Sequence, residues 1–159
     1  MLGEKLQQRY QIFAILGRGI FATVVRARDL QQNGREVAIK IARRQETMYK
    51  AGMKEISILQ RLSEADPDNK MFIVHFFTHF EHRGHLCMVF ESLGLNLREI
   101  VKRFGKDVGL NLQAVKTYTK QMLLALALLR EKQFVHADIK PDNILVNEAK
   151  TCLLYTSDA

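Results

Sequence analysis

Hydrophobic and polar residues alternate along much of the first half of the chain, a pattern typical of β-strands. Residues 10–30 alternate on both sides of a glycine-containing turn and therefore predict a hairpin. An Asn-Gly pair, which favours a tight turn, precedes a further predicted strand over residues 35–42. Two more strand-like runs cover residues 71–80 and 85–90.

Apolar residues spaced three and four positions apart predict three helices, over residues 48–62, 96–105 and 111–132. The second helix opens with Asn96-Leu-Arg-Glu99, which resembles a capping box, and ends at Gly105, a residue type common just after a helix. In the third, residues 122–129 are apolar nearly all the way round. Other parts of the protein must therefore cover this helix on several sides.

The composition indicates a globular domain and excludes several classes of function. The 159 residues are 47% hydrophobic, enough for a packed core. The net charge of +7 comes from basic residues scattered among acidic ones, so we interpret it as solvated surface rather than a nucleic-acid-binding face. We expect neither secretion nor membrane insertion, because no apolar run has the required length. The two cysteines, Cys87 and Cys152, lack metal-ligand spacing, which makes a reducing compartment the default. The histidines of residues 75–85 also lack the spacing of a metal site.

The loop of residues 134–146 has the most concentrated polar chemistry in the chain. It reads Phe-Val-His-Ala-Asp-Ile-Lys-Pro-Asp-Asn-Ile-Leu-Val, and we expect its two apolar ends to form short strands. The spacing of His136, Asp138 and Asn143 favours a phosphoryl-transfer loop, in which the aspartate accepts a hydroxyl proton and the asparagine holds a metal ion. The alternative is a solvated turn in which Asp138 and Asn143 only satisfy backbone groups.

A second polar pattern lies in the first predicted hairpin and the strand after it. Gly17 and Gly19 would let backbone N–H groups approach anionic oxygens, but Ala22 fills the third position of Gly-x-Gly-x-x-Gly, so an ordinary hairpin turn also fits. Lys40 stands among apolar residues, where an ammonium needs a partner. Glu55 on the first predicted helix can be that partner and aim the lysine at nucleotide phosphates. Otherwise Lys40 reaches solvent from an edge strand, and Glu55 is a surface charge.

Together these motifs resemble those of eukaryotic Ser/Thr protein kinases. The resemblance runs over about residues 10–151. Residues 96–110 and 136–148, together with residues 85–91, are similar to the pre-mRNA-processing splicing kinases of the Prp-four type. Those kinases belong to the CMGC group, like the dual-specificity tyrosine-regulated kinases. The resemblance implies an α+β, protein-kinase-like fold. A small β-rich N-lobe with one regulatory helix would cover residues 10–92 after a flank at residues 1–9. The first helices and the catalytic loop of a helical C-lobe would cover residues 93–151.

The resemblance also implies that the cofactors are ATP and Mg²⁺. Lys40, held by Glu55, would contact the α and β phosphates, and the backbone from Gly17 through Gly19 to Ala22 would cover them. Residues about the adenine are also implied: Val24, Ala38 and Leu145 on its faces, Phe90 as gatekeeper, and Glu91 with Leu93 as the hinge.

Roles in phosphoryl transfer are implied for three residues of the loop. Asp138 would be the catalytic base, Lys140 would steady the γ-phosphoryl group, and Asn143 would ligate Mg²⁺. Ala137 departs from the common pattern, in which an arginine precedes the catalytic aspartate. The splicing kinases share this alanine, which implies a different mode of activation.

The end of the sequence departs further. No Asp-Phe-Gly follows residue 151, so we assign no metal to Asp158. Residues 152–159 resemble a translated sequencing adaptor, and a natural splice-variant tail is the alternative. We therefore expect an incomplete catalytic domain, poorly soluble, with negligible phosphate transfer of its own.

Three hypotheses of function follow. The first is a Ser/Thr protein kinase acting on protein substrates of the spliceosome, nuclear by resemblance and otherwise cytoplasmic, with no direct nucleic-acid or membrane partner. The second is a catalytically inactive truncated isoform that acts as a nucleotide- or partner-binding module. The third, a basic RNA-binding module, lacks an aromatic and basic recognition motif.

Overall fold

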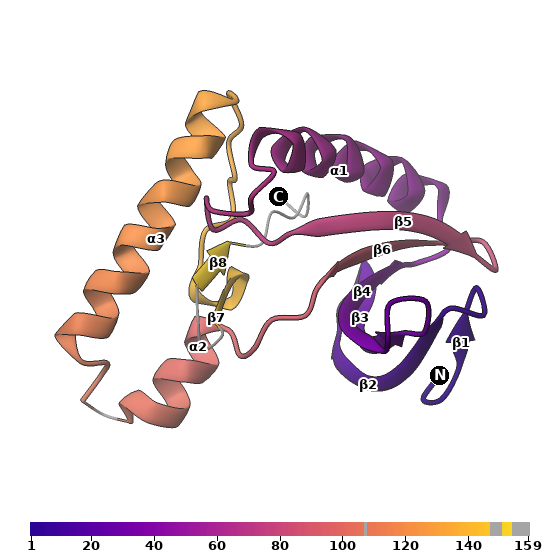
Figure 1. Ribbon diagram of the computed structural model, residues 1–159, viewed down its shortest axis with the longest axis horizontal. Coiled ribbons are helices and arrows are strands. Elements are labelled where there is room, and N and C mark those ends of the chain that lie inside the picture. Colours follow the sequence, from indigo (N-terminus) through magenta and orange to yellow (C-terminus); the bar gives the residue numbers. More distant parts are fainter. Residues whose placement is uncertain (107, 147–150, 154–159) are drawn as a thin grey trace. The chain divides into compact units, whose positions relative to one another are not determined.

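The computed structural model describes residues 1–106, 108–146 and 151–153, with only the backbone for residues 151 and 152. The chain has an α+β fold and divides into two compact units (Figure 1). The first unit comprises Met1–Gln60 and His75–Ser92, and the second comprises Arg61–Val74 and Leu93–Ala159. Residues 61–74, which lie within the predicted N-lobe, therefore group with the second unit.

The first unit is built on an antiparallel six-stranded sheet with the strand order β1-β2-β3-β4-β6-β5. Its strands are β1 (Lys5–Leu6), β2 (Tyr10–Arg18), β3 (Ala22–Asp29), β4 (Arg35–Ala42), β5 (Phe76–His82) and β6 (His85–Glu91). The predicted hairpin and the predicted strand after the Asn-Gly turn are confirmed. Asn33 and Gly34 both have positive φ, as the tight turn between β3 and β4 requires.

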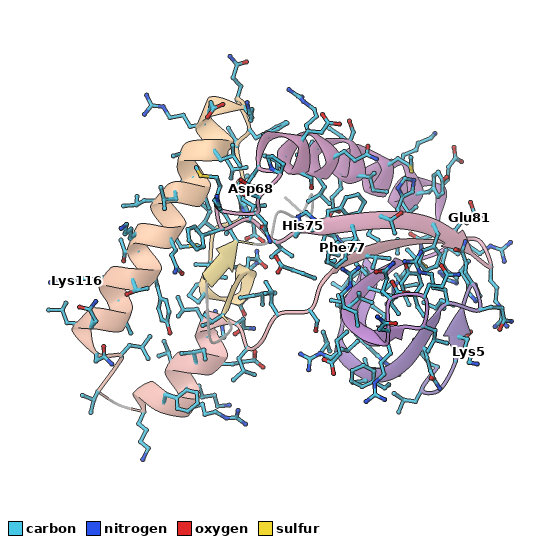
Figure 2. All side chains as sticks on the ribbon, viewed as in Figure 1. Lys5, Asp68, His75, Phe77, Glu81 and Lys116 are labelled. Atoms are coloured by element: carbon cyan, nitrogen blue, oxygen red, sulfur yellow. The ribbon has the colours of Figure 1, made fainter. Side chains whose placement is uncertain are left out.

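The predicted strand over residues 71–80 is wrong at its start, because β5 begins only at Phe76. The Asp66 carboxylate accepts hydrogen bonds from the backbone N–H groups of Lys70 and Met71, which holds this segment in a turn. Phe72 follows with a φ of 59°, a left-handed conformation that cannot continue a strand. Just before β5, the His75 ring makes a T-shaped contact with the Phe77 ring, with the ring centroids 5.1 Å apart (Figure 2).

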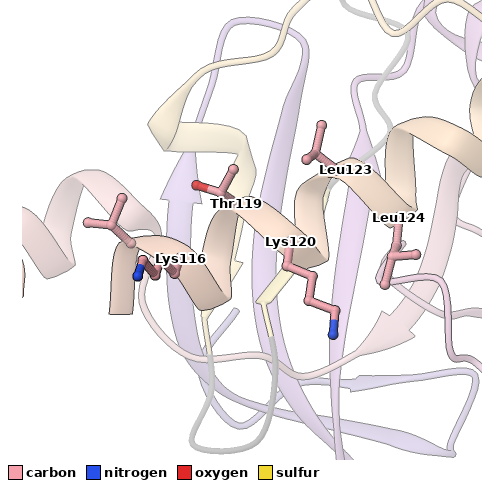
Figure 3. A pocket seen from close by; sticks show the side chains of 6 residues that line it. Lys116, Thr119, Lys120, Leu123 and Leu124 are labelled. Carbon is pink, nitrogen blue, oxygen red and sulfur yellow. The ribbon is translucent and has the colours of Figure 1, made fainter. Parts of the chain in front are cut away.

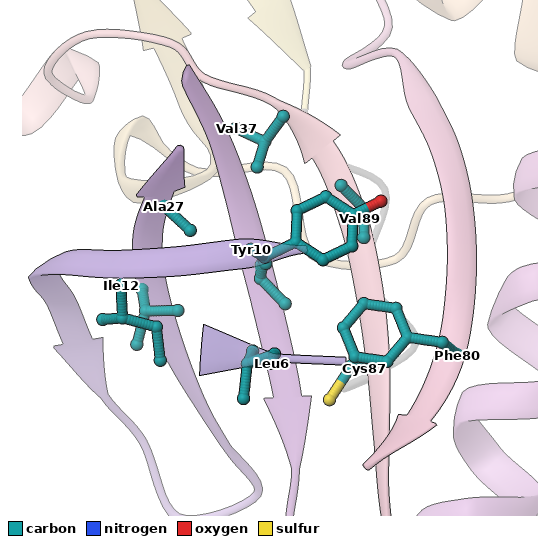
Figure 4. Packing of buried hydrophobic residues seen from close by; sticks show 10 residues of the cluster. Leu6, Tyr10, Ile12, Ala27, Val37, Phe80, Cys87 and Val89 are labelled. Atoms are coloured by element: carbon teal, nitrogen blue, oxygen red, sulfur yellow. The ribbon is translucent and has the colours of Figure 1, made fainter. Parts of the chain in front are cut away.

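One hydrophobic cluster of the first unit lies on one face of the sheet. It is a cluster of buried residues from β1 to β6: Leu6, Tyr10, Ile12, Val25, Ala27, Val37, Ile39, Phe80, Cys87 and Val89 (Figure 4). The Tyr10 and Phe80 rings stack with centroids 5.3 Å apart. Because successive residues of a strand point to opposite faces, burying Val37 and Ile39 directs Ala38 and Lys40 to the other face of the sheet.

Helix α1 (Glu46–Ala65) extends the predicted helix at both ends and buries Ile56, Leu59 and Leu62, as the apolar spacing predicts. Gly52 allows the helix to approach β6 closely. A Cβ built on Gly52 would lie 2.5 Å from Cδ2 of the buried Leu86. This close contact fixes the turn of α1 that lies just before Glu55.

The second unit contains the predicted capping box. Asn96 accepts a hydrogen bond from the Glu99 N–H at 2.8 Å, and the Glu99 side chain accepts one from the Asn96 N–H at 3.0 Å. Helix α2 (Leu97–Ile100) starts here and continues as the π-helix η1 (Val101–Gly105). The prediction that Gly105 follows the helix is wrong by one residue, because Gly105 is still helical and the left-handed residue is Lys106, with a φ of 44°.

Helix α3 (Leu112–Glu131) has the predicted ends, with Asn111 as N-cap and Lys132 as C-cap. Its residues Ala125, Leu128 and Leu129 are buried, whereas Leu123 on the opposite flank is 61% exposed. That flank borders an open groove of about 470 Å³ (Figure 3), lined by Val115, Lys116, Thr119, Lys120, Leu123 and Leu124. The described residues therefore cover the apolar helix only in part. None of their helices is both long and apolar enough to cross a membrane.

After α3 the chain forms the short 3₁₀ helix η2 (Pro141–Asn143) and the strand pair β7 (Ile144–Val146) and β8 (Thr151–Leu153). The predicted exit strand is thus confirmed as β7. Leu153 is fully buried, its N–H donates to the Phe72 carbonyl, and its carbonyl accepts from the Val74 N–H. Asp158 lies outside the described residues.

The predicted strand at the start of the loop is wrong. The Phe134 N–H donates to the Leu129 carbonyl at 2.8 Å, so Phe134 takes part in ending α3. Val135 is 81% exposed and belongs to no strand. Phe134 and Val135 therefore follow the end of α3 and do not form the predicted strand. The Arg61 guanidinium also lies 4.7 Å from the centre of the Phe134 ring.

Candidate functional site

The polar loop of the second unit is anchored by His136. This side chain is buried, and its Nδ1 accepts a hydrogen bond from the Asp138 N–H at 3.2 Å. Between them Ala137 has a φ of 64°, a conformation that residues with a Cβ rarely adopt. The loop is therefore held in a tight left-handed bend immediately before Asp138.

The side chains of Asp138, Lys140 and Asn143 converge in this loop. Lys140 Nζ lies 2.8 Å from Asp138 Oδ2. Asn143 Nδ2 donates to the same Oδ2 and to the Asp138 backbone carbonyl, both at 2.9 Å. The carboxylate is thus held by two side chains, which favours the phosphoryl-transfer interpretation over a turn that only satisfies backbone groups.

The electrostatics of this group favour an ionised aspartate. The Lys140 ammonium holds the pKa of Asp138 below its usual value, and the hydrogen bond from Asn143 acts in the same direction. Reciprocally, the Asp138 carboxylate raises the pKa of Lys140. Asp138 is therefore ionised at neutral pH, the state that a proton acceptor needs.

A contact that we did not predict joins the loop to α2. Arg98 Nε lies 2.9 and 3.0 Å from the two carboxylate oxygens of Asp142, and the guanidinium lowers the pKa of that carboxyl. The exit of the loop is also attached, because the Val146 N–H donates to the Leu95 carbonyl at 2.8 Å and Leu145 forms a bridge with Asn96. No local pattern signals these contacts, because their partners are far apart in the sequence.

In the first unit, the predicted ion pair between Lys40 and Glu55 is present. Lys40 Nζ lies 3.0 and 3.2 Å from the two Glu55 carboxylate oxygens. Glu55 is only 1% exposed, and Lys40 lies on β4 between β3 and β6. The alternative of a lysine reaching solvent from an edge strand is therefore wrong.

The register of the sheet gathers the other residues that we associate with the adenine. Val24 on β3 is paired with Lys40, and Ala38 on β4 is paired with Phe90 on β6. Directly paired residues of antiparallel strands point to the same face, so all four lie on the face opposite the cluster of Val37 and Ile39. The small Ala38 and the branched Val24 there flank the lysine.

The residues predicted as the hinge belong to separate units. Glu91 ends β6 and forms two hydrogen bonds with the backbone of His75. The Glu91 N–H donates to the His75 carbonyl at 3.0 Å, and the Glu91 Oε1 accepts from the His75 N–H at 2.8 Å. Leu93, in the second unit, is buried, and Leu145 there is half-buried on β7. The structure therefore gathers the predicted site residues into two groups, one in each unit.

The glycine loop joins β2 and β3. The Gly19 N–H donates to the Ala22 carbonyl at 2.8 Å, which closes the turn. Neither Gly17 nor Gly19 has a positive φ, and a Cβ on Gly17 would meet no atom of the described residues within 4 Å. Packing within the described residues therefore does not require glycine at position 17.

Comparison with known proteins identifies the family. The sequence profile of the protein kinase domain matches residues 10–156. The chain is 52% identical over 153 residues to the serine/threonine-protein kinase prp4 of Schizosaccharomyces pombe, which covers 96% of this chain and 32% of that protein. It is 44% identical over 154 residues to the serine/threonine-protein kinase prpf4B of Dictyostelium discoideum, covering 96% of this chain and 19% of that protein.

A third relative is the serine/threonine-protein kinase SRPK of Physarum polycephalum, which is 40% identical over 151 residues, covering 92% of this chain and 35% of that protein. The chain thus spans about a third or less of the length of these relatives. The profile match and the site geometry together identify this chain as a member of the protein kinase domain family.

Proposed function

We propose that this chain forms part of an enzyme that transfers phosphate from ATP to serine or threonine residues of proteins. The observation that carries the proposal is the convergence of Lys140 and Asn143 on a single carboxylate oxygen of Asp138. An ionised aspartate held in this way can accept the proton of a substrate hydroxyl, and the adjacent ammonium can stabilise negative charge on the transferred group.

The residues present suit ATP and Mg²⁺. Lys40 is held by Glu55 on the sheet face that also displays Val24 and Ala38, so its ammonium can hold a phosphate beside an apolar surface. Asn143 donates its amide N–H to Asp138, which assigns the role of cation ligand to its carbonyl oxygen, the atom type that Mg²⁺ prefers. When bound, Mg²⁺ would neutralise phosphate charge during transfer.

The finer assignment follows the residues that resemble splicing kinases. Residues 85–91, 96–110 and 136–148 carry that resemblance. The capping box falls within the second of these stretches and the Asp138 group within the third. We propose a kinase of the CMGC group that acts in the nucleus on protein substrates of the spliceosome.

The test is phosphate transfer by the complete open reading frame that contains this chain, with radiolabelled ATP and spliceosomal proteins as acceptors. We expect Mg²⁺-dependent labelling on serine or threonine, and its loss in Lys40→Met. Lys50→Met is the matched control, because Lys50 is an exposed residue of α1 that forms an ion pair with the exposed Glu46. Phosphotransfer that persists in Lys40→Met at the level of the Lys50→Met control would contradict the proposed role of Lys40.

The inactive-module hypothesis predicts a different result in the same assay. The unmodified protein would then bind ATP, as measured by calorimetry, and label no acceptor. Assaying the polypeptide of residues 1–159 in parallel shows whether these residues alone transfer phosphate.

A further inference from the structure

One charged contact beside the proposed base has no role in the chemistry described above. Arg98, in the four-residue helix α2, donates from Nε to both carboxylate oxygens of Asp142. Asp142 lies in η2, directly before Asn143. Both side chains are exposed, and exposed ion pairs contribute little to stability. The location of the pair therefore matters more than its contribution to folding.

Lys140 has a carboxylate two residues away on either side. Its Nζ lies 2.8 Å from Asp138 Oδ2, whereas the carboxylate of Asp142 is occupied by Arg98. The charges of Asp142 and Arg98 act on Lys140 in opposite directions, so the guanidinium offsets the attraction of the second carboxylate. Without Arg98, the flexible lysine would have two competing partners.

The backbone around Arg98 is anchored at two points. The capping box between Asn96 and Glu99 fixes the first turn of α2. Asn96 also bridges to Leu145 at the loop exit. Arg98 therefore projects from a backbone that is tied to the same loop that contains Asp142.

We propose that Arg98 is a positioning residue of the catalytic loop, which occupies the carboxylate of Asp142 and thereby keeps Lys140 paired with Asp138. This inference rests on the proposed phosphotransfer, in which Lys140 steadies the transferred group beside the base. Arg98 itself touches neither the base nor the lysine in any contact of the described residues. It acts only by removing a competitor.

Three variants of the complete open reading frame test this inference through their kinetics. Arg98→Gln frees the Asp142 carboxylate, and we expect kcat to fall about tenfold while KM for ATP changes less than about twofold. Asp142→Asn removes the competing charge, and we expect kcat within about twofold of the unmodified protein. The double variant Arg98→Gln, Asp142→Asn should regain the activity lost in Arg98→Gln, because no competing carboxylate remains.

A simple tether between α2 and the loop would behave differently. Asp142→Asn would then lose as much activity as Arg98→Gln, and the double variant would not recover. Either result, or an unchanged kcat in Arg98→Gln, overturns the inference. Arg103→Gln is the control for loss of an exposed arginine, since Arg103 lies in the adjoining segment η1. Melting temperatures verify that every variant is folded.

Crystal structures of the Arg98→Gln variant supply a readout that does not depend on turnover. We expect Lys140 Nζ within hydrogen-bond distance of Asp142, and a lysine that remains on Asp138 alone overturns the inference. A lack of phosphate transfer by the unmodified protein would instead contradict the proposed function, and the crystallographic test would still decide the role of Arg98.

Discussion

Lys40 Nζ and Glu55 Oε2 lie 3.0 Å apart, and this ion pair joins β4 to α1 inside the first unit. The glutamate is almost fully buried, whereas the lysine lies on the sheet face that also carries Val24 and Ala38. A buried carboxylate is costly without a nearby counter-charge, and the Lys40 ammonium provides one. The pair therefore couples the position of the helix to that of the lysine.

Replacing Glu55 by glutamine tests the charge of this side chain separately from its shape. The amide preserves the shape of the side chain but removes the negative charge that pairs with Lys40, so we expect at least a tenfold loss of kcat/KM for ATP in the complete open reading frame. Steady-state kinetics measure this loss. Glu64→Gln, on an exposed part of the same helix, is the control. Equal kinetics in the two variants would contradict the proposed role of Glu55.

Asp138→Asn should remove the proton acceptor while preserving the hydrogen-bonding geometry. We expect a loss on the order of 10²–10⁴ in kcat, with KM for ATP nearly unchanged. The measurement is steady-state phosphate transfer by the complete open reading frame at varied ATP concentration. Near-normal turnover in this variant would show that Asp138 is not the base.

The ion pair between Arg9 and Asp29 should contribute a pH-dependent part of the stability of the first unit. The Asp29 side chain is 1% exposed, and two bonds of 2.7 and 2.8 Å from Arg9 hold its pKa below the usual value. Because the folded pKa is lower than the unfolded one, this contribution is fully present above about pH 5 and disappears as the pH falls through the folded pKa.

We therefore expect Asp29→Asn to lower the free energy of unfolding by about 1–3 kcal/mol at pH 7. The difference from the unmodified protein should shrink as the pH falls below about 4. Urea denaturation at several pH values measures both effects. Asp68→Asn, which removes an exposed ion pair with Lys70, should change stability by less than about 0.5 kcal/mol. A difference for Asp29→Asn that is independent of pH would count against the ion pair as its source.

Gly52→Ala should destabilise the protein although alanine favours helices. The added Cβ would lie 2.5 Å from Cδ2 of Leu86, whose burial limits its movement. We expect a net cost of about 1 kcal/mol, because overpacking outweighs the gain in helix propensity. In a Leu86→Ala background the same change should stabilise, since the obstructing methyl is gone. Denaturant titration of the four proteins measures this reversal, and equal effects in both backgrounds would contradict the packing argument.

Short-range patterns in the sequence determined much of this protein. The alternation of residues 10–30, the Asn33-Gly34 turn and the capping box at Asn96 each depend on neighbours within a few residues, and the structure contains all three. The ion pair of Lys40 with Glu55 was also predictable, because a lysine in an apolar strand needs a partner.

Only the tertiary structure decided the features that depend on distant partners. Phe134 ends α3 instead of forming a strand, since its N–H bonds back to the helix and no strand lies beside it among the described residues. The start of β5 depends on the Asp66 turn together with the pairing of Val74 with Leu153. Arg98 meets Asp142 across 44 positions of sequence. The periodicity of a sequence indicates whether a residue is buried or exposed, but not which distant residue it contacts. Only the folded chain therefore determines which carboxylate Lys140 contacts.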